Sequence, residues 1–353
     1  MTQVEYKSPQ DAPLNQFDNA ARTYDALLVV SFGGPEGMDD VIPFLENVLR
    51  GRNVPRARLE EVAHHYEMFN GISPLNDQNR ALIAALETEL KTNGPDLPIY
   101  WGNRNWHPFL EDTLRQMTND GVRRALALFT TAYSSYSSCR QYREDIQRAQ
   151  AAVGPDAPEI DKLRAFYNHP EFIQPNVENL LIAVEQIPAE RRAAAHIAFT
   201  AHSLPMSMAR NCDYEVQLQE TSRLVAEGAG QANWQLVYQS RSGPPHQPWL
   251  GPDIVDHLEA LKASGVTDVV VMPVGFISDH MEIIYDLDTE AVQAASDLGL
   301  NLVRASTVGT HPTFIHMLGS LIRERMTANP VRLSVGNRGP NHDICGLGCC
   351  LPG

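Results

Sequence analysis

The sequence predicts an α/β protein made of two similar halves, each with a parallel sheet flanked by helices. Short apolar runs alternate with longer amphipathic stretches, which is the order expected of strand–helix–strand units. Several of the short runs are apolar at nearly every position, as parallel strands covered on both faces are. The chain has 353 residues, a length that favours two domains over one.

The predicted strands are the apolar runs Ala26–Phe32, Ile99–Gly102, Arg124–Thr130, His196–Ala201, Gln235–Gln239, Asp268–Val274 and Leu302–Ala305. The stretches between them predict helices, among them Gln78–Thr92, Pro108–Asn119, Asp213–Glu227, Pro252–Ser264 and Pro312–Met326. Ligands of such sheets bind beyond the carboxyl ends of the strands, so the residues that follow each strand are the first candidates for a site.

A weak internal repeat relates the two halves. The segment from Tyr100 to Ser135 contains a helix, a Gly-Val turn, an apolar strand and a polar turn, and the segment from Tyr238 to Asp279 has the same order. The repeat fits two related halves, and it fits equally well the general similarity of all βα units.

The chain divides into four expected segments. Residues 1–20 are polar and lack the apolar region of a signal peptide, so they predict a mobile arm. Residues 21–165 and 166–311 are the two expected domains, with their boundary near Asp161–His169. Residues 312–353 predict a helix and a cysteine tail that pack back on the first domain, joined by a linker rich in Pro, Gly and Asn.

The charge excludes several classes of function. The chain has 28 Lys and Arg residues and 43 Asp and Glu residues, which gives a net charge of −15. This charge argues against a nucleic-acid binder, because such proteins need a basic face that contacts the phosphates. The same charge argues against adhesion to an anionic membrane. No apolar run reaches the roughly 18 residues of a membrane-spanning helix. We therefore expect a cytoplasmic protein with no nucleic-acid partner and no stable membrane association.

A histidine at the end of a predicted buried strand is the first candidate for chemistry. His202, in the run FTAHSLP, lies where α/β sheets bind ligands. Its imidazole can take and return protons near physiological pH, or bind a metal. A lone histidine in this position more often does no more than bond to a neighbouring loop.

An acidic segment after another predicted strand is the second candidate. In GFISDHMEIIYDLD, Asp279, Glu282 and Asp286 are spaced i, i+3, i+7, which would place their carboxylates on one helical face near His280. Like charges this close raise one another's pKa values, so such a row can relay protons or attract a cation. A structural reading also fits, with Asp279 as the N-cap and Glu282 at N3 of a capping box.

Five cysteines, three of them in the last nine residues, predict a metal or cluster site in a reducing compartment. Cys345, Cys349 and Cys350 need a fourth ligand, for which Cys139 and Cys212 are the candidates. Thiolates select zinc or iron–sulfur clusters, and the spacing alone does not choose between them. The structural alternative is a flexible tail with reactive thiols.

Two further features bear on the ligand. The pair Gly33-Gly34 lacks G-x-G-x-x-G spacing, and Pro35 removes an amide donor, so we reject a dinucleotide site. Arginines suit bidentate capture of carboxylates and predict an anionic carboxylate ligand. Those that follow predicted strands are Arg104, Arg140, Arg143 and Arg241.

The run FTAHSLPMSM at Phe199–Met208 resembles a signature of the ferrochelatase family, whose members insert ferrous iron into a porphyrin. Gly275–Asp288 is similar to the second active-site segment of that family. VVSFGGPEGMDDVIPFLENV, NRNWHPFLEDTL and PWLGPDIVDHL match further family blocks, in order, over nearly the whole chain after Tyr24. The resemblance implies two Rossmann-like (chelatase-type) domains around a porphyrin cleft.

The resemblance also implies roles for single residues. His202 matches the histidine that faces the macrocycle and takes pyrrole protons or passes metal, and Glu282 matches the opposing carboxylate. Both would contact the substrate Fe²⁺. The implied proton or metal path contains Asp279, His280 and Asp286, and the expected porphyrin-binding residues are Phe32, Arg104, Tyr133 and Trp249. Phe32 stands where some members have a tyrosine that touches the metal, so we expect no axial contact from that side.

Some members carry a [2Fe–2S] cluster, and the resemblance implies one here. Cys139 matches the internal ligand, and Cys345, Cys349 and Cys350 supply the tail, which leaves Cys212 as a spare thiol. The adjacent pair Cys349-Cys350 departs from the wider spacing of some members.

The implied substrates are Fe²⁺ and a porphyrin. Val48–Glu61, which matches the lip of membrane-associated members, is polar and basic here, so it suits the extra propionates of coproporphyrin III. The alternatives are protoporphyrin IX, insertion of Co²⁺ or Ni²⁺ into a related tetrapyrrole, and a carrier without turnover. Transient iron-donor and haem-acceptor proteins are expected partners.

Overall fold

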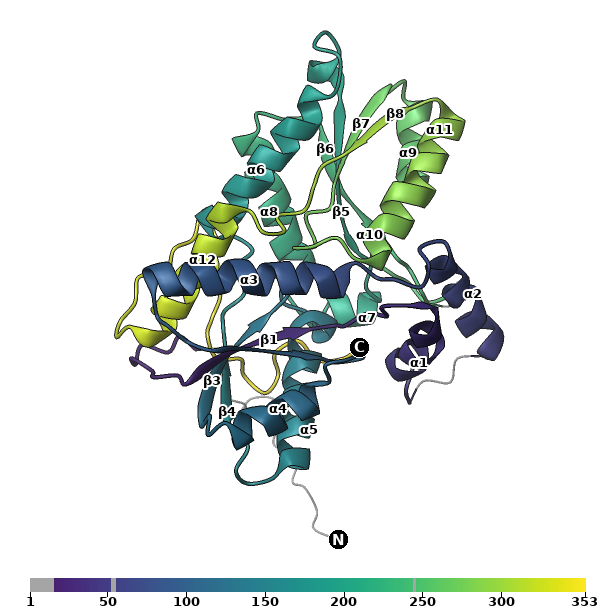
Figure 1. Cartoon of the computed structure of the whole chain (residues 1–353). Helices are drawn as coiled ribbons and strands as arrows, with labels where there is room; N and C mark the ends of the chain where they lie inside the picture. The colour runs from purple at the N-terminus through teal and green to yellow at the C-terminus, as the bar shows by residue number, and fades with distance from the viewer. Residues whose placement is uncertain (1–15, 52–54, 244–245) are drawn as a thin grey trace.

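The computed structural model describes residues 16–51, 55–243 and 246–353, and it contains two four-stranded sheets in which all neighbouring strands are parallel (Figure 1). The strand order is β2-β1-β3-β4 in the first sheet and β6-β5-β7-β8 in the second. The second sheet therefore repeats the topology of the first, which supports the two related halves of the sequence repeat. The strands are β1 (Ala26–Ser31), β2 (Ile99–Asn103), β3 (Arg124–Phe129), β4 (Glu159–Lys162), β5 (His196–His202), β6 (Trp234–Gln239), β7 (Asp268–Met272) and β8 (Asn301–Arg304).

Seven of these strands match the predicted runs to within a few residues, and β4 was not predicted. Its sequence, Glu-Ile-Asp-Lys, has a single apolar residue and none of its residues is fully buried. The strand lies at the sheet edge, where it pairs only with β3, so one side of its backbone is not covered by a neighbouring strand. An edge position explains the missing apolar signal.

The helices cover the faces of the two sheets and connect their strands, as parallel sheets require. Those of the first half are α1 (Met38–Val48), α2 (Arg56–Glu67), α3 (Leu75–Asn93), α4 (Leu110–Asn119), a π-helical turn η2 (Tyr136–Arg140) and α5 (Gln141–Val153). Those that follow are α6 (Pro170–Glu185), η3 (Arg192–Ala194), α7 (Met206–Ala209), α8 (Tyr214–Gly228), α9 (Ile254–Ala263), α10 (Met281–Tyr285), a π-helical segment η4 (Asp286–Ala291), α11 (Val292–Leu298) and α12 (Pro312–Met326).

One hydrophobic core runs through both halves. Leu27 and Val29 of β1 belong to the same buried cluster as Phe199 of β5 and Met272 of β7. Alternate residues of each strand point the other way, into two smaller cores. A fourth cluster joins α1 and α2 to Met281 of α10. The two sheets therefore share one continuous apolar interior, and the α1–α2 pair packs apart from it.

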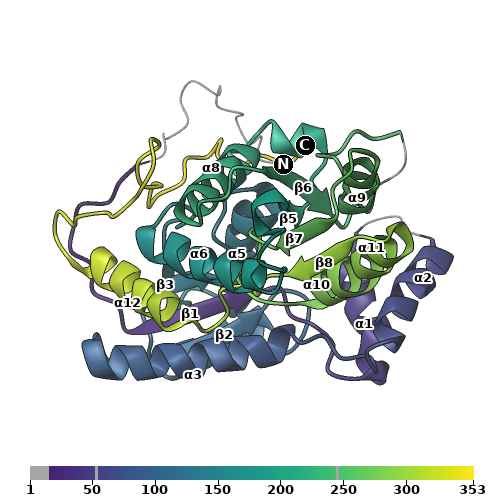
Figure 2. The same ribbon diagram turned by 90° about the horizontal axis from the view of Figure 1, so that it is seen from above.

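Helix α12 has the predicted bounds, with His311 as its N-cap and Pro312 in the first turn. It packs against α3 of the first half and α6 of the second (Figure 2). The ion pair between the fully buried Arg164 and Glu324 of α12, 2.8 Å, fixes this helix to the end of β4.

The tail after α12 runs back along the start of the chain. Ile344 and Gln16 form an antiparallel bridge, and the Asp18 carboxylate pairs with Arg325, 3.2 Å. Residues 16–20 are held in this way, which differs from the mobile arm expected there, and residues 1–15 lie outside the described part. Within the described residues we find no helix long and apolar enough to span a bilayer.

Candidate functional site

Two side chains meet beyond the carboxyl ends of neighbouring strands of the second sheet. His202 is the last residue of β5, and Glu282 follows β7 in the first turn of α10. The Nε2 atom of His202 lies 3.4 Å from Oε1 of Glu282. The Nδ1 atom of His202 donates to the Ser203 carbonyl, 2.5 Å, which leaves Nε2 for the carboxylate. The structure thus brings together the pair that the sequence singled out first.

The two groups hold each other in their charged forms. Burial alone would lower the pKa of His202, but the Glu282 carboxylate outweighs it and raises that pKa to about 9. Burial alone would raise the pKa of Glu282, and the imidazolium of His202 instead lowers it to about 2. The His202 side chain is 31% exposed and that of Glu282 45%, so both can be reached by a ligand.

His280 is the N-cap of α10. Its Nδ1 atom accepts from the backbone N–H of Glu282, 3.2 Å, and its Nε2 atom lies 3.8 Å from the Glu282 carboxylate. Burial is the main reason that the pKa of His280 lies below its usual value. The predicted capping box with Asp279 as N-cap is therefore wrong, because the next residue takes that position.

Asp279 faces away from this pair, toward β8. Its carboxylate pairs with Arg304, 3.3 Å, and accepts from the Thr307 hydroxyl, 3.2 Å. The expected single helical face is also wrong for Asp279, because α10 begins only at Met281. Asp279 thus belongs to an ion pair that joins the α10 entrance to the neighbouring strand.

Asp286 continues the site on the side of β6. It accepts hydrogen bonds from the Ser240 hydroxyl and from Gln239 Nε2, the latter 3.4 Å, and Gln239 also donates to the Glu282 carbonyl, 2.9 Å. Burial raises the pKa of Asp286 to about 7, while the Ser240 hydrogen bond opposes that rise. Gln239 and Ser240 were not among the predicted site residues, although Gln239 ends β6 and Ser240 follows it at the same sheet edge.

The four residues expected to contact the porphyrin differ in how accessible their side chains are. Phe32 is 37% exposed and lies edge-on to Phe44, so its ring is open to a ligand. Trp249 is half-buried and bridges to Pro205, three residues after His202. Phe32 directly follows β1, although it was predicted to be the last residue of that strand, and Trp249 lies in the segment after β6.

The side chains of Arg104 and Tyr133 are buried. The Arg104 side chain is 6% exposed, pairs with Asp145 and stacks on Tyr142 at 4.6 Å from the ring centre. Tyr133 is buried in the shared core, where its hydroxyl donates to the Val274 carbonyl, 2.7 Å. In this structure both side chains are occupied by contacts within the protein, and their direct contact with a porphyrin stays a prediction.

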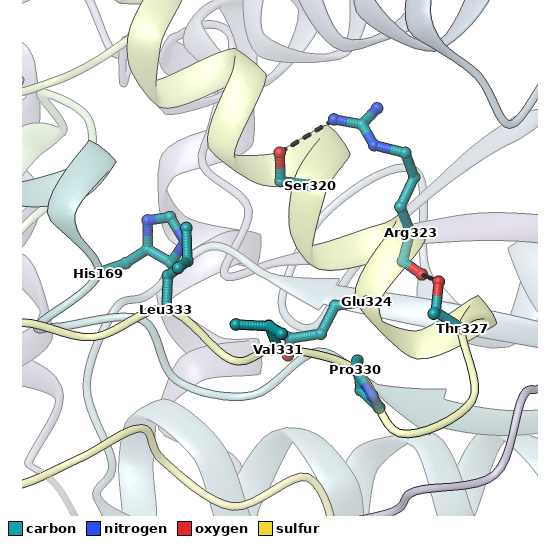
Figure 3. Close-up of a pocket in the computed structure, with 8 residues that line it drawn as sticks. All are labelled: His169, Ser320, Arg323, Glu324, Thr327, Pro330, Val331 and Leu333. Carbon is teal, nitrogen blue, oxygen red and sulfur yellow. Dashed lines mark hydrogen bonds between the residues drawn. The ribbon is translucent and has the colours of Figure 1, made fainter.

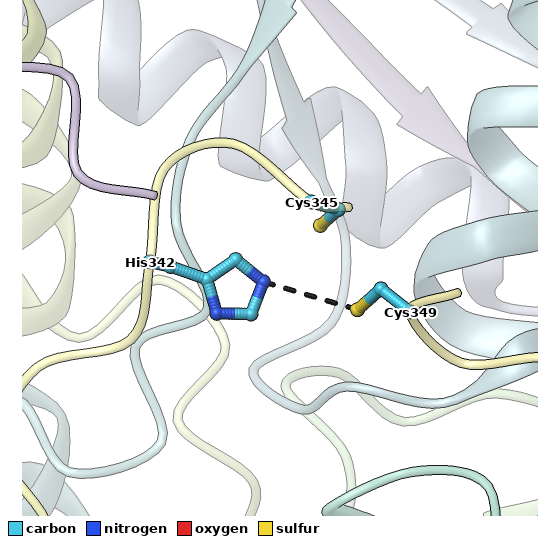
Figure 4. A group of neighbouring side chains, drawn as sticks. All are labelled: His342, Cys345 and Cys349. Carbon is cyan, nitrogen blue, oxygen red and sulfur yellow. Dashed lines mark hydrogen bonds between the residues drawn. The ribbon is translucent and has the colours of Figure 1, made fainter. Parts of the chain in front are cut away.

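A second group of reactive side chains gathers where the tail meets η2. Cys139 of η2 is in hydrogen-bonding contact with Cys345, and Cys349 lies 3.6 Å from Cys350, sulfur to sulfur. All described cysteines are free thiols. His342, Cys345 and Cys349 have ligand atoms within 4.8 Å of one another, so they form a candidate metal site (Figure 4).

Basic side chains surround this thiol group. Lys162, at the end of β4, is half-buried beside Cys139 and Cys345, and the negative charge of these two cysteines raises its pKa although desolvation opposes the rise. Arg140 donates to the carbonyls of Leu347, 2.7 Å, and Cys349, 3.0 Å. Positive charge at these positions stabilises thiolates, the form in which cysteine binds metals. Lys162 and His342 escaped the sequence analysis because neither belongs to a motif.

Two small hollows lie away from these groups. One, about 180 Å³, is lined by His169, Arg323 and Leu333 among others, between α12 and the tail (Figure 3). The other, about 160 Å³, lies beside Gln78 and Ser278 at the junction of α3 with the loop after β7. Gln78 accepts from the backbone N–H of Asp279, 2.9 Å, so this second hollow adjoins the entrance of α10.

Comparison with known proteins identifies the family to which the chain belongs. A family model described as Ferrochelatase matches residues 24–326. A ferrochelatase of Rhodopirellula baltica is 54% identical over 329 residues, covering 93% of this chain and 93% of that protein. A coproporphyrin III ferrochelatase of Streptomyces coelicolor is 51% identical over 354 residues, covering 94% of each chain. One of Nocardia farcinica with the same description is 51% identical and covers 93% of this chain and 97% of its own.

A solved structure supports the fold independently. SirB from Bacillus subtilis with Fe³⁺ superimposes with a TM-score of 0.52 at 15% identity, covering 86% of this chain and 96% of that one. At this identity the likeness concerns the architecture of two α/β halves alone.

Proposed function

The chain belongs to the ferrochelatase family, and from that premise we propose that it inserts ferrous iron into coproporphyrin III, an enzymatic step of haem biosynthesis. The observation that carries the mechanism is the pair of His202 and Glu282, 3.4 Å apart at the ends of neighbouring strands. Insertion releases two pyrrole protons as Fe²⁺ takes their place, so the site needs a proton acceptor and an anion beside the metal.

Glu282 explains how His202 is made ready to accept a proton. Without a ligand, the pKa of about 9 keeps His202 protonated at neutral pH. An arriving Fe²⁺ at Glu282 competes with the imidazolium for the carboxylate, which lowers the pKa of His202 and frees its Nε2 atom. The metal thus prepares the base that receives the first pyrrole proton.

Asp286 offers the next position for that proton. Its pKa of about 7 allows it to hold a proton and release it near neutral pH, and Gln239 links it to the Glu282 backbone. We assign His202 and Glu282 as catalytic residues and Asp286 with His280 as the path by which protons leave. Asp279 acts on this path indirectly, through its ion pair with Arg304.

The choice of coproporphyrin III is supported by the names of the Streptomyces and Nocardia relatives and by the polar lip Val48–Glu61. Within the described part of this lip, Arg56 pairs with Glu46 and Glu60, each 3.0 Å. Residues 52–54, with a further arginine, lie outside the described part. A lip of exposed ion pairs has little apolar area to bury in lipid.

The test is anaerobic mixing of the purified protein with Fe²⁺ and either coproporphyrin III or protoporphyrin IX, followed by porphyrin absorption. Faster conversion of coproporphyrin supports the proposal. Faster conversion of protoporphyrin keeps the enzyme class and refutes the argument from the lip. Binding of either porphyrin without conversion would favour the carrier alternative, which has no use for an opposed base and carboxylate.

We further propose that the tail site holds a [2Fe–2S] cluster. Cys139, Cys345, Cys349 and Cys350 are free thiols from two segments, and Lys162 supplies compensating positive charge, so the donor set fits such a group. When bound, a cluster supplies one-electron redox chemistry and a link between the tail and η2. None of the proton or metal steps above uses it.

The setting of the reaction is part of the proposal. We expect the protein to work in the cytoplasm, where thiols remain reduced. Fe²⁺ and the haem product are both reactive, so we expect transient contacts with a donor of iron and an acceptor of haem.

A further inference from the structure

Two cations beside the tail thiols have no carboxylate partner. Lys162 ends β4, is half-buried, and donates through Nζ to the Leu163 carbonyl, 3.5 Å, but it forms no ion pair with a described residue. Arg143 of α5 forms neither an ion pair nor a hydrogen bond within the described part of the chain, and its Nε atom is buried. A cation that is removed from water needs an anion or an acceptor, so both side chains indicate an anionic partner.

The first sheet directs the Lys162 side chain toward the thiols. Alternate residues of a strand point to the same face, so Lys162 shares its face of β4 with Ile160. Ile160 packs in the apolar cluster that contains Cys139 and, at its border, Cys345. The β3 residues that pair with Lys162 and Ile160 belong to that cluster as well. Lys162 therefore lies on the side of the sheet where the tail meets η2.

Arg143 approaches the same thiols from α5. The π-helical turn η2, which carries Cys139, continues directly into α5. Residues four apart lie on one side of a helix, so Arg143 shares its side with Cys139. Its charge also acts on Cys350, and it lies close enough to Lys162 for the two cations to repel each other. Negative charge bound between them would relieve this repulsion.

The acidic side chains near these cations are engaged elsewhere. Asp343 acts on Lys162 from a distance, but its Oδ2 atom pairs with Arg332, 2.7 Å. Glu144 pairs with Arg140, 2.8 Å. The protein thus leaves the charges of Lys162 and Arg143 for a group that the thiols bind.

We propose that Lys162 and Arg143 are the counter-ions of the tail cluster and make its reduction potential more positive than it would be without them. This inference rests on the proposed [2Fe–2S] cluster with four cysteine ligands. Two ferric ions, two sulfides and four thiolates sum to two negative charges, and one-electron reduction adds a third. A fixed cation stabilises the more negative, reduced form more strongly, so both residues favour reduction.

The test is a redox titration of the full chain, purified anaerobically with its natural cofactor. Dithionite supplies one electron per cluster, which reduces one ferric ion to ferrous, and visible absorption and electron paramagnetic resonance follow the reduction. Lys162→Met and Arg143→Met remove one charge each, whereas Lys162→Arg and Arg143→Lys keep it. The matched controls are Lys262→Met and Arg148→Met, which remove charges from exposed side chains. Iron and acid-labile sulfide per chain report cluster content, and thermal unfolding reports folding.

We expect each neutral variant to shift the equilibrium between reduced and oxidised cluster about tenfold toward the oxidised form, which is about 59 mV to more negative potential for a one-electron couple. The double neutral variant shifts further than either single one. The charge-keeping variants and both controls stay near the wild-type potential. If a neutral variant loads little cluster, recovery of cluster content in the charge-keeping variant supports the same role.

An unchanged potential in both neutral variants overturns the inference. So does an equal loss of cluster in Lys162→Met and Lys162→Arg, because that result would show a role in packing and not in charge. A chain that carries zinc without sulfide, or no metal at all, overturns the inference together with the cluster. Porphyrin metallation is assayed separately, and its failure would refute the proposed enzyme activity without changing the measured potentials.

Discussion

Nε2 of His202 and Oε1 of Glu282 lie 3.4 Å apart, although 80 residues separate them in the chain. Parallel pairing of β5 with β7 creates this contact, because both strands end at the same edge of the sheet. Substitution of either residue therefore tests the proposed chemistry of the site.

His202→Ala removes the proposed proton acceptor. General-base catalysis contributes about 10²–10⁴-fold to a rate, so we expect kcat to fall by that order while porphyrin affinity stays near the wild-type value. Stopped-flow metallation and fluorescence titration of the porphyrin measure the two quantities. Turnover at the wild-type rate would exclude His202 as the base.

Glu282→Gln tests the electrostatic link within the pair. Without the carboxylate, burial is opposed only by the Ser203 carbonyl and Asp286, so we expect the pKa of His202 to fall well below about 9. Nuclear magnetic resonance titration of histidine-labelled protein measures this shift. A pKa that stays near 9 would show that Glu282 is not its cause.

The same pair has a signed effect on stability. The raised pKa of His202 stabilises the folded state. This contribution is complete below pH 6.5, the usual pKa of histidine, and is lost as the pH rises through about 9. The lowered pKa of Glu282 contributes stability that is present above 4.5 and is lost as pH falls through about 2. The difference in Tm between wild type and Glu282→Gln should therefore be largest between pH 4.5 and 6.5 and shrink above pH 9.

Asp286→Asn replaces a carboxyl whose pKa is raised from 3.8 to about 7. A raised pKa contributes stability that is complete below 3.8 and is lost as pH rises through about 7, so the asparagine variant should gain in Tm relative to wild type on going from pH 5 to pH 8. Its insertion rate should fall and lose the pH dependence near 7. Differential scanning fluorimetry and rate–pH profiles check both, and an unchanged profile would remove Asp286 from the proton path.

Glu324→Gln breaks the buried pair with Arg164, whose side chains are 7% and 1% exposed. Removing one partner of such a pair leaves the other charge uncompensated, and we expect a loss of about 3–5 kcal/mol in the free energy of unfolding. The control is Glu111→Gln, which breaks an exposed 2.9 Å pair with Arg115. That substitution should change stability by no more than about 0.5 kcal/mol in the same urea titration. Equal effects would contradict the role given to burial.

Gly275→Ala tests the close approach of β7 to β5. An added Cβ would lie 2.5 Å from the Cβ of Ala201, the residue before His202. We expect the end of β5 to shift, with a loss of about 1–3 kcal/mol in stability and a lower kcat. The control Gly37→Ala places a Cβ with no heavy atom within 4 Å and should be close to neutral. Unchanged activity in Gly275→Ala would show that the backbone absorbs the methyl group.

Strands and helices could be predicted from the sequence where a short run of neighbouring residues carries their apolar pattern or their capping residues. Buried strands such as β5 have apolar residues at nearly every position, and α12 begins at a proline that fits the first turn of a helix. The position of His202 at a strand end follows from the same pattern. β4 carries a weak signal because its edge position does not require apolar residues on both faces.

Contacts between residues far apart in the sequence could not be predicted from local patterns. Asp279 pairs with Arg304, 25 residues away, so its departure from the predicted helical face could not be read from the local spacing. Tyr133 carries the polar turn motif but is buried by the second half, through Val274. His342 belongs to no motif and gains meaning only when the tail folds against Cys139.

The single core that joins β1, β5 and α12 bears on how the molecule opens. If the two sheets swung apart, apolar side chains of both would be exposed together, so separation of the halves and loss of the native state are one event. The helices α1 and α2 pack in a cluster of their own against α10, so they can move without exposing the shared core. We expect heating to give one cooperative transition, while amide exchange shows that α1 and α2 open more often than the rest.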